Sequence, residues 1–148
     1  MEIERKYLIN ELPENLNIVE SRILEQGYLC TEPVVRIRRD NDEFILTYKS
    51  KGLMIREEHN LPLTQEAYEH LKQKVDGRLI SKTRHIIPLD DELKIELDIF
   101  HGDLAPLMLA EVEFPDENTA NAFNAPDWFG EDVTFSSKYH NSNLSKIG

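Results

Sequence analysis

Residues 92–100 read ELKIELDIF, and charged and apolar side chains alternate through this stretch. The even positions carry charges and the odd positions carry aliphatic groups: Glu92, Lys94, Glu96 and Asp98 against Leu93, Ile95, Leu97 and Ile99. Successive side chains of an extended chain point to opposite faces. The stretch therefore predicts a β-strand with one charged face and one apolar face.

The same alternation recurs along the chain. Charged residues that share a face in this way are Glu2, Glu4 and Lys6, Arg36 and Arg38, Lys49 and Lys51, Lys82 and Arg84, and Glu111 and Glu113. A solvated sheet face explains one such group, but like charges that face each other across strands destabilise a sheet. We therefore expect the charged face to line the lumen of a closed or nearly closed barrel, with helices covering the apolar outside.

Turn signals and periodicity predict the remaining elements. Strands are expected at residues 1–10, 28–40 with a break near Pro33, 43–51, 53–61, 79–89, 92–100 and 107–114. Helices are expected at 13–26, where an apolar stripe ends before Gly27, and at 64–75, capped by Thr64. Helical turns are also expected after Asp116 and from Ser136. The fold class is α+β, in a single domain spanning residues 1–148.

Composition limits the classes of function. The chain has 28 acidic and 17 basic residues and a net charge of −11, which argues against nucleic acid or an anionic membrane as the main partner. It shows neither a signal-peptide pattern nor an apolar run of the roughly 20 residues that a membrane span needs. Cys30 is the single cysteine. These features predict a cytoplasmic protein.

Charged pairs on a shared face indicate the chemistry of a ligand. Clustered Arg and Lys are costly unless an anion with several oxygens binds among them, and the Arg guanidinium matches phosphate oxygens geometrically. Clustered carboxylates are relieved by hard divalent cations such as Mg²⁺ or Mn²⁺. The two kinds of cluster in one lumen predict a metal-bound polyphosphate as the ligand.

The order of these motifs resembles that of the CYTH, or triphosphate tunnel metalloenzyme, superfamily. The matching residues, from Glu2 to Lys138, are Glu2, Glu4, Lys6, Arg36, Arg38, Lys49, Lys82, Arg84, Glu96, Asp98, Glu111, Glu113 and Lys138. The resemblance implies an eight-stranded antiparallel β-barrel, a tunnel with a charged lumen and helices packed outside. One of the strands predicted above must then split, and the break near Pro33 is the expected place.

The resemblance also implies roles for the matching residues. The residues expected to bind triphosphate are Lys6, Arg36, Arg38, Lys49, Lys82, Arg84 and Lys138. Those expected to bind metal are Glu2, Glu4, Asp98, Glu111 and Glu113. Catalysis is expected to depend on Glu2, Glu4, Lys6, Arg38, Glu111 and Glu113.

The implied function is hydrolysis of inorganic tripolyphosphate to pyrophosphate and phosphate with Mg²⁺ or Mn²⁺, as in the short bacterial triphosphatases. Three alternatives stay open: a class IV adenylate cyclase, a thiamine triphosphatase, and a non-catalytic module that binds polyphosphate or nucleotide. The cyclase needs a nucleoside pocket, which no motif in this sequence marks. The binding module would gain nothing from the lumenal carboxylates without metal.

Overall fold

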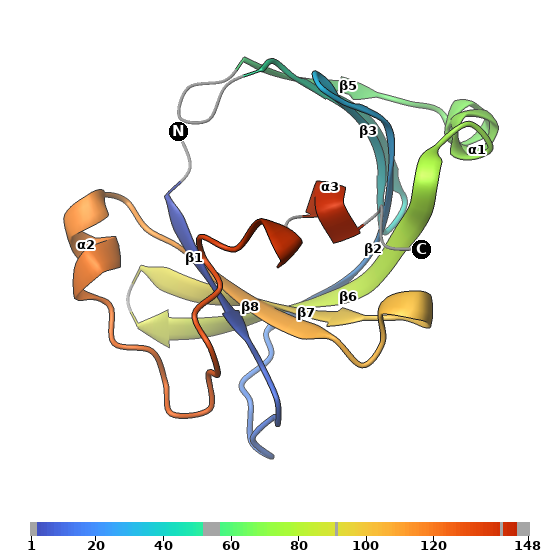
Figure 1. The fold of residues 1–148 in the computed structure, drawn as a ribbon. Helices are drawn as coiled ribbons and strands as arrows, with labels where there is room; N and C mark the ends of the chain where they lie inside the picture. The colour runs from blue at the N-terminus through green and yellow to red at the C-terminus, as the bar shows by residue number, and fades with distance from the viewer. Residues whose placement is uncertain (1–2, 52–56, 91, 140, 145–148) are drawn as a thin grey trace. The chain divides into compact units, whose positions relative to one another are not determined.

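The fold is an eight-stranded antiparallel sheet with helices, seen in a computed structural model that describes residues 3–51, 57–90, 92–139 and 141–144 (Figure 1). The strand order in the sheet is β1-β8-β7-β6-β2-β3-β4-β5. The chain divides into two compact units. Unit 1 comprises Met1–Arg22 and Lys82–Ser136, and unit 2 comprises Ile23–Ser81 and Ser137–Gly148.

The α+β class is confirmed by the order of the elements. The strands are β1 (Glu4–Leu8), β2 (Glu20–Thr31), β3 (Val34–Asp40), β4 (Glu43–Lys49), β5 (Glu58–Pro62), β6 (Asp76–Asp90), β7 (Leu93–Phe100) and β8 (Met108–Glu113). The α-helices are α1 (Gln65–Lys72), α2 (Glu117–Ala122) and α3 (Asn141–Leu144). Short 3-10 helices are η1 (Gly102–Leu104) and η2 (Ser137–Tyr139). None of these described helices is long and apolar enough to cross a membrane.

In unit 1 the pairing register separates charged from apolar residues. Lys6 of β1 lies opposite Glu111 of β8, and Glu111 lies opposite Glu96 of β7, so these three side chains share a face. The other face forms a core around Leu97 and Val112, against which Ala120 of α2 packs. The aromatic residues of the chain that follows α2, Phe123, Trp128 and Phe129, pack on the same core. The apolar outside covered by a helix is thus present in this unit.

The outer edge of β1 is covered by residues 130–134, which we call the edge segment. The Leu8 N–H donates to the Glu131 carbonyl at 2.8 Å, and the Val133 N–H donates to the Lys6 carbonyl at 2.8 Å. The Asp132 carboxylate accepts a 2.6 Å hydrogen bond from Arg5, whose guanidinium also donates to the Ala120 carbonyl at 2.9 Å. These bonds satisfy the strand edge and tie it to α2.

In unit 2 helix α1 packs on the apolar face of β3 and β4 (Figure 1). Tyr68 of α1 is fully buried, contacts Phe44, and donates its O–H to Glu25 of β2 at 2.8 Å. Gly27 of β2 gives the necessary room, because a Cβ there would lie 2.7 Å from Val75 Cγ1. The glycine therefore allows β2 to approach the chain that follows α1.

The prediction of a helix at residues 13–26 is wrong. Residues 11–19 contain no helix, and Glu20 begins the strand β2, which continues to Thr31. Four apolar residues at helical spacing suggested the helix, but pairing of β2 with β3 from Leu24 onwards stabilises the extended conformation instead. Tertiary hydrogen bonding here overrides a local pattern.

Other boundaries agree with the sequence more closely. The break near Pro33 is confirmed, since β2 ends at Thr31 and β3 begins at Val34. Thr64 and Asp116 cap α1 and α2 through their side-chain oxygens, as predicted. Helix α1 ends at Lys72, three residues earlier than expected. Of the predicted strand 53–61, the structure shows Glu58–Pro62, while residues 52–56 lie outside the described chain.

Gly130 gives a test of the edge segment. A Cβ at this position would lie 2.7 Å from the backbone oxygen of Leu8, an atom that cannot move without disturbing β1. We expect Gly130→Ala to lower the free energy of unfolding by about 1–3 kcal/mol, measured by urea denaturation. Asn124→Ala, in the same loop but exposed, is the control and should stay close to wild type. Equal stability of Gly130→Ala and wild type would contradict the close approach.

Candidate functional site

The carboxylate of Asp98 joins two basic side chains on the charged face of unit 1. Its Oδ2 accepts from Lys82 Nζ at 2.7 Å and from Arg84 Nη2 at 2.9 Å, and its Oδ1 accepts from Arg84 Nε at 2.8 Å. The side chains of Lys82 and Asp98 are each 1% exposed. The register of β6 and β7 sets Arg84 directly opposite Asp98. Buried charges are thus paired here with several charge-assisted hydrogen bonds.

These contacts set the charge states of the three groups. Burial opposes ionisation of Asp98, but the charges and hydrogen bonds of Lys82 and Arg84 outweigh it and lower the pKa of Asp98 to about 2. Burial also opposes the charge of Arg84, and the hydrogen bond and charge of Asp98 more than compensate, so the pKa of Arg84 is raised. Burial lowers the pKa of Lys82, and the charge of Asp98 only partly offsets this effect. Asp98 and Arg84 are therefore an ion pair at neutral pH.

Two further ion pairs continue the charged face towards β1. Glu96 Oε2 lies 2.8 Å from Arg84 Nη1, and Lys6 Nζ lies 3.4 Å from Glu111 Oε1. The side chains of Lys6 and Glu111 are 10% and 12% exposed. The structure therefore brings together five residues that the sequence nominated: Lys6, Lys82, Arg84, Asp98 and Glu111.

The paired carboxylates are at the outer end of this face. Glu4 of β1 lies directly opposite Glu113 of β8, and both residues are exposed. Two carboxylates opposite each other on neighbouring strands repel, and a hard cation relieves that repulsion. This donor chemistry fits a divalent metal, although within the described chain no group of three His, Cys, Asp or Glu side chains forms a metal cluster. Glu2 lies outside the described residues.

Asp98 is less suited to binding metal than the sequence suggested. Both of its oxygens accept hydrogen bonds from Lys82 and Arg84, and the side chain is almost completely buried. A metal at Asp98 would have to replace these bonds. The observed geometry makes Asp98 the counter-ion of two bases.

Unit 2 carries its own set of basic side chains. Arg36 and Arg38 of β3 are separated by one residue and project from the same face of the strand. Arg36 lies opposite Thr47 of β4, which shares its face with Lys49. Lys49 Nζ is 4.0 Å from Glu58 of β5. The Nε of Arg36 is buried, and among the described residues it has no hydrogen-bond partner.

Lys138, the last basic residue expected to bind triphosphate, belongs to the 3-10 helix η2 of unit 2. Its side chain is exposed, and Nζ lies 5.3 Å from the centre of the Tyr139 ring.

Sequence reasoning missed a polar residue beside Arg38. Gln26 of β2 is fully buried and lies directly opposite Arg38 in the β2–β3 register. It escaped notice because residues 13–26 were expected to be helical. Read as a strand, the alternation of Leu24, Gln26 and Tyr28 would have placed the three side chains on one face.

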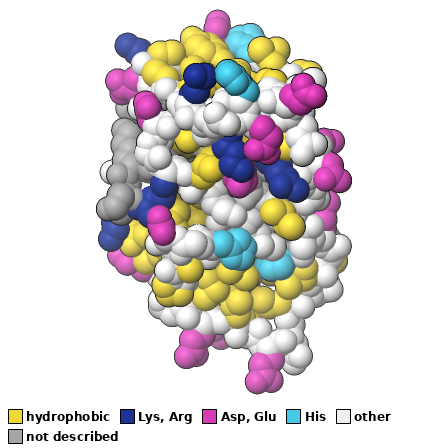
Figure 2. All heavy atoms as spheres, turned by 90° about the vertical axis from the view of Figure 1, so that its right-hand side faces the viewer, with side chains coloured by type: hydrophobic (Ala, Val, Ile, Leu, Met, Phe, Trp, Pro, Cys, Tyr) yellow, Lys and Arg dark blue, Asp and Glu magenta, His cyan; other side chains and the backbone are white. Residues whose placement is uncertain are grey.

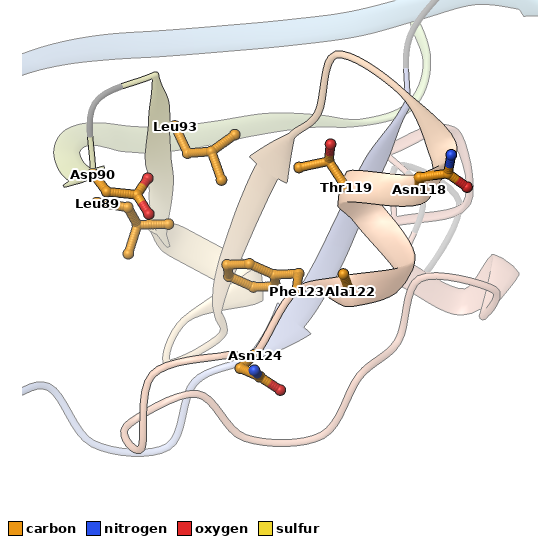
Figure 3. Close-up of a pocket in the computed structure, with 8 residues that line it drawn as sticks. All are labelled: Leu89, Asp90, Leu93, Asn118, Thr119, Ala122, Phe123 and Asn124. Carbon is orange, nitrogen blue, oxygen red and sulfur yellow. The ribbon is translucent and has the colours of Figure 1, made fainter.

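An open pocket of about 620 Å³ in unit 1 has a different character (Figure 3). Leu89, Leu93 and Phe123 line it, with Asp90 at its margin and no Lys or Arg among the described lining residues. A polyanion would meet a carboxylate there without a compensating base. On the surface drawn in Figure 2, Lys and Arg side chains are interspersed with Asp and Glu. The charged strand faces are therefore better candidates for binding a polyanion.

Comparison with known proteins gives a consistent result. The family model described as CYTH domain matches residues 1–148. The inorganic triphosphatase of Nitrosomonas europaea is 41% identical over 148 residues, covering 97% of this chain and 96% of that protein. The inorganic triphosphatase of Acetivibrio thermocellus is 35% identical over 150 residues, covering 98% and 93%. A crystal structure of an inorganic triphosphatase superposes with a TM-score of 0.80 at 38% identity, covering 98% of this chain and 94% of that chain.

Removal of the Asp98 charge should destabilise the protein strongly. Asp98→Asn leaves Lys82 and Arg84 buried without their shared counter-ion, so we expect a loss of about 3–5 kcal/mol in the free energy of unfolding. Urea denaturation at pH 7 measures it. Glu92→Gln, at the exposed start of the same hairpin, is the matched control and should change stability little. A small loss in Asp98→Asn would mean that the buried cluster contributes little to stability.

The stabilising effect of Asp98 should also depend on acid pH. Its folded pKa of about 2 is below the usual 3.8, so its contribution is complete above about pH 4 and is lost as pH falls towards 2. The stability difference between wild type and Asp98→Asn should therefore shrink by about 2 kcal/mol between pH 5 and pH 2. Denaturant titrations at several pH values measure this difference. A difference that did not vary with pH would show that the folded protein does not lower the pKa of Asp98.

Proposed function

Because this chain belongs to the CYTH domain family, we propose that it is a metal-dependent hydrolase that cleaves inorganic triphosphate to pyrophosphate and phosphate. The relatives at 41% and 35% identity, both named inorganic triphosphatase, support this substrate. The observation that carries the proposal is the β1–β8 register. It sets Glu4 and Glu113 opposite each other, two residues along the strands from the Lys6–Glu111 ion pair.

The basic residues serve as ligands for phosphoryl oxygens in this proposal. In unit 1 they are Lys6, Lys82 and Arg84, and in unit 2 they are Arg36, Arg38, Lys49 and Lys138. Water attacks a terminal phosphorus, the bridging P–O bond breaks, and negative charge grows on the leaving pyrophosphate. Fixed Lys and Arg side chains stabilise that charge without reorganising during the reaction.

Asp98 and Glu96 are proposed to hold Arg84 in place for this role. The guanidinium of Arg84 spans both carboxylates, at 2.8 Å from each. Because a bidentate ion pair restricts a guanidinium, Arg84 is oriented before the substrate arrives. Arg38 is proposed to bind the triphosphate and to take part in catalysis, as the sequence resemblance implied.

The proposed metal ligands are Glu2, Glu4, Glu111 and Glu113, with Mg²⁺ or Mn²⁺ as the ion. Asp98 was also nominated, but its bonds to Lys82 and Arg84 favour its role as a counter-ion. Bound metal would supply Lewis-acid polarisation of phosphoryl oxygens and a water of lowered pKa. Glu111 also pairs with Lys6, so it orients this lysine as well.

The first test of the function is an assay of purified protein with tripolyphosphate, ATP and thiamine triphosphate in the presence of Mg²⁺ or Mn²⁺. We expect tripolyphosphate to give pyrophosphate and phosphate with the highest kcat/KM, and excess EDTA to stop the reaction. Glu111→Gln, which removes one carboxylate charge, should lower kcat by about 100-fold while the protein stays folded.

Glu117→Gln, in the exposed first turn of α2, is the control and should retain wild-type turnover. Cyclic AMP as the main product from ATP would replace the hydrolase with a cyclase. Turnover that persists in excess EDTA would disprove the role of the metal. Absence of turnover on all three substrates would disprove the enzymatic function.

A further inference from the structure

The most unusual polar group in unit 2 is the side-chain amide of Gln26. The residue is 0% exposed, yet neither Oε1 nor Nε2 has a hydrogen-bond partner among the described residues. A buried amide that makes no hydrogen bond has lost its bonds to water and gained none in return. Native proteins rarely keep such a group, and it calls for a physical explanation.

The neighbouring polar residues of the same unit show the ordinary solution. Thr47 of β4 is 1% exposed, and its hydroxyl donates to Asn60 of β5 at 2.6 Å. Glu25, the residue before Gln26, accepts from Tyr68 and pairs with Lys72 on the helix side of β2. The side chains of Thr47 and Glu25 thus have partners, whereas the amide of Gln26 has none among the described residues.

The register places Gln26 within a basic environment. Gln26 lies opposite Arg38, and Tyr28, two residues further along β2, lies opposite Arg36. Directly opposite residues on antiparallel strands have Cβ atoms about 4.5–5.5 Å apart, so the amide and the guanidinium of Arg38 are neighbours on one sheet face. The Nε of Arg36, on the same face, is also buried without a described partner. Unused donors therefore gather on two adjacent strands.

We propose that Gln26 contacts the substrate directly, with its Nε2 donating a hydrogen bond to a phosphoryl oxygen of the triphosphate bound by Arg38. The inference rests on the proposed function and adds a ligand to its anion site. A phosphoryl oxygen is a charged acceptor, which strengthens the bond from a neutral amide. Oε1 would repel the same oxygen, so the ligand orients the amide with Nε2 towards it. Burial excludes water from the bond.

This role makes opposite predictions for stability and for binding. Gln26→Met keeps the length and lack of branching of the side chain and removes the amide. Since the free protein loses only an unpaired buried group, its melting temperature should be equal to or above that of wild type. Its Kd for tripolyphosphate should rise about 10- to 100-fold, the range for one hydrogen bond to a charged group.

Binding is measured by calorimetry and by thermal melting with tripolyphosphate in excess EDTA, where the proposed reaction does not run. Arg38→Ala is the reference for a lost phosphate ligand. Gln73→Met, at the exposed end of α1, is the matched control and should keep both wild-type affinity and wild-type melting temperature. Gln26→Glu is the second variant. Its carboxylate would pair with Arg38 and repel the ligand, so it should bind tripolyphosphate more weakly than Gln26→Met.

The outcomes separate this inference from the function on which it rests. Wild-type affinity in Gln26→Met and in Gln26→Glu would overturn the contact while leaving the hydrolase intact. A lower melting temperature of Gln26→Met with unchanged affinity would make Gln26 an ordinary structural residue. Weakened binding in the variants of a wild-type protein that does not hydrolyse tripolyphosphate would support the contact and disprove the hydrolase. A wild-type protein that does not bind tripolyphosphate would overturn both.

Discussion

The charged face of unit 1 depends on the hydrogen bonds that Lys82 and Arg84 donate to the carboxylate of Asp98. A sheet face that carries Lys82 and Arg84 into the interior would be unstable if these charges were left alone, because desolvation of each cation is costly. The Asp98 carboxylate accepts hydrogen bonds of 2.7–2.9 Å from both side chains, and the Glu96 carboxylate pairs with Nη1 of Arg84. The bases are thereby held in fixed positions, while Glu4 and Glu113 lie opposite each other at the exposed end of the face.

The two units differ in the partners of their buried polar side chains. In unit 1 ion pairs join acid to base across β1, β8, β7 and β6. In unit 2 the face shared by β2 and β3 holds Arg36 and Gln26 with buried donors that no described residue accepts. In the first arrangement each buried charge is paired with an opposite charge of the protein itself. In the second arrangement buried donors have no described acceptor, and this difference is the basis of the inference about Gln26.

The comparisons and the side-chain geometry bear on different questions. Identity of 41% across nearly the full chain establishes the family and supports inorganic triphosphate as the substrate. The geometry addresses which group does what, and here it changes the assignment of Asp98 from metal ligand towards counter-ion. A carboxylate whose two oxygens already accept three hydrogen bonds from cations has little capacity left for a hard metal.

The sequence by itself determined the strands that alternate in charge and the residues on each face. Because the side-chain period of a strand is two, ELKIELDIF could satisfy a charged face and an apolar face only as the strand β7. Pro33 favoured the break between β2 and β3, because proline lacks the N–H that a strand interior needs. Thr64 and Asp116 likewise predicted the starts of α1 and α2, since an N-cap is a local interaction. Partners distant in sequence were decided by the tertiary structure. Residues 24–26 became strand because β3 offered backbone hydrogen bonds, and this pairing set Gln26 beside Arg38. The register of β6 against β7 placed Asp98 beside Lys82 and Arg84. The sequence pattern of either strand alone does not predict this pairing.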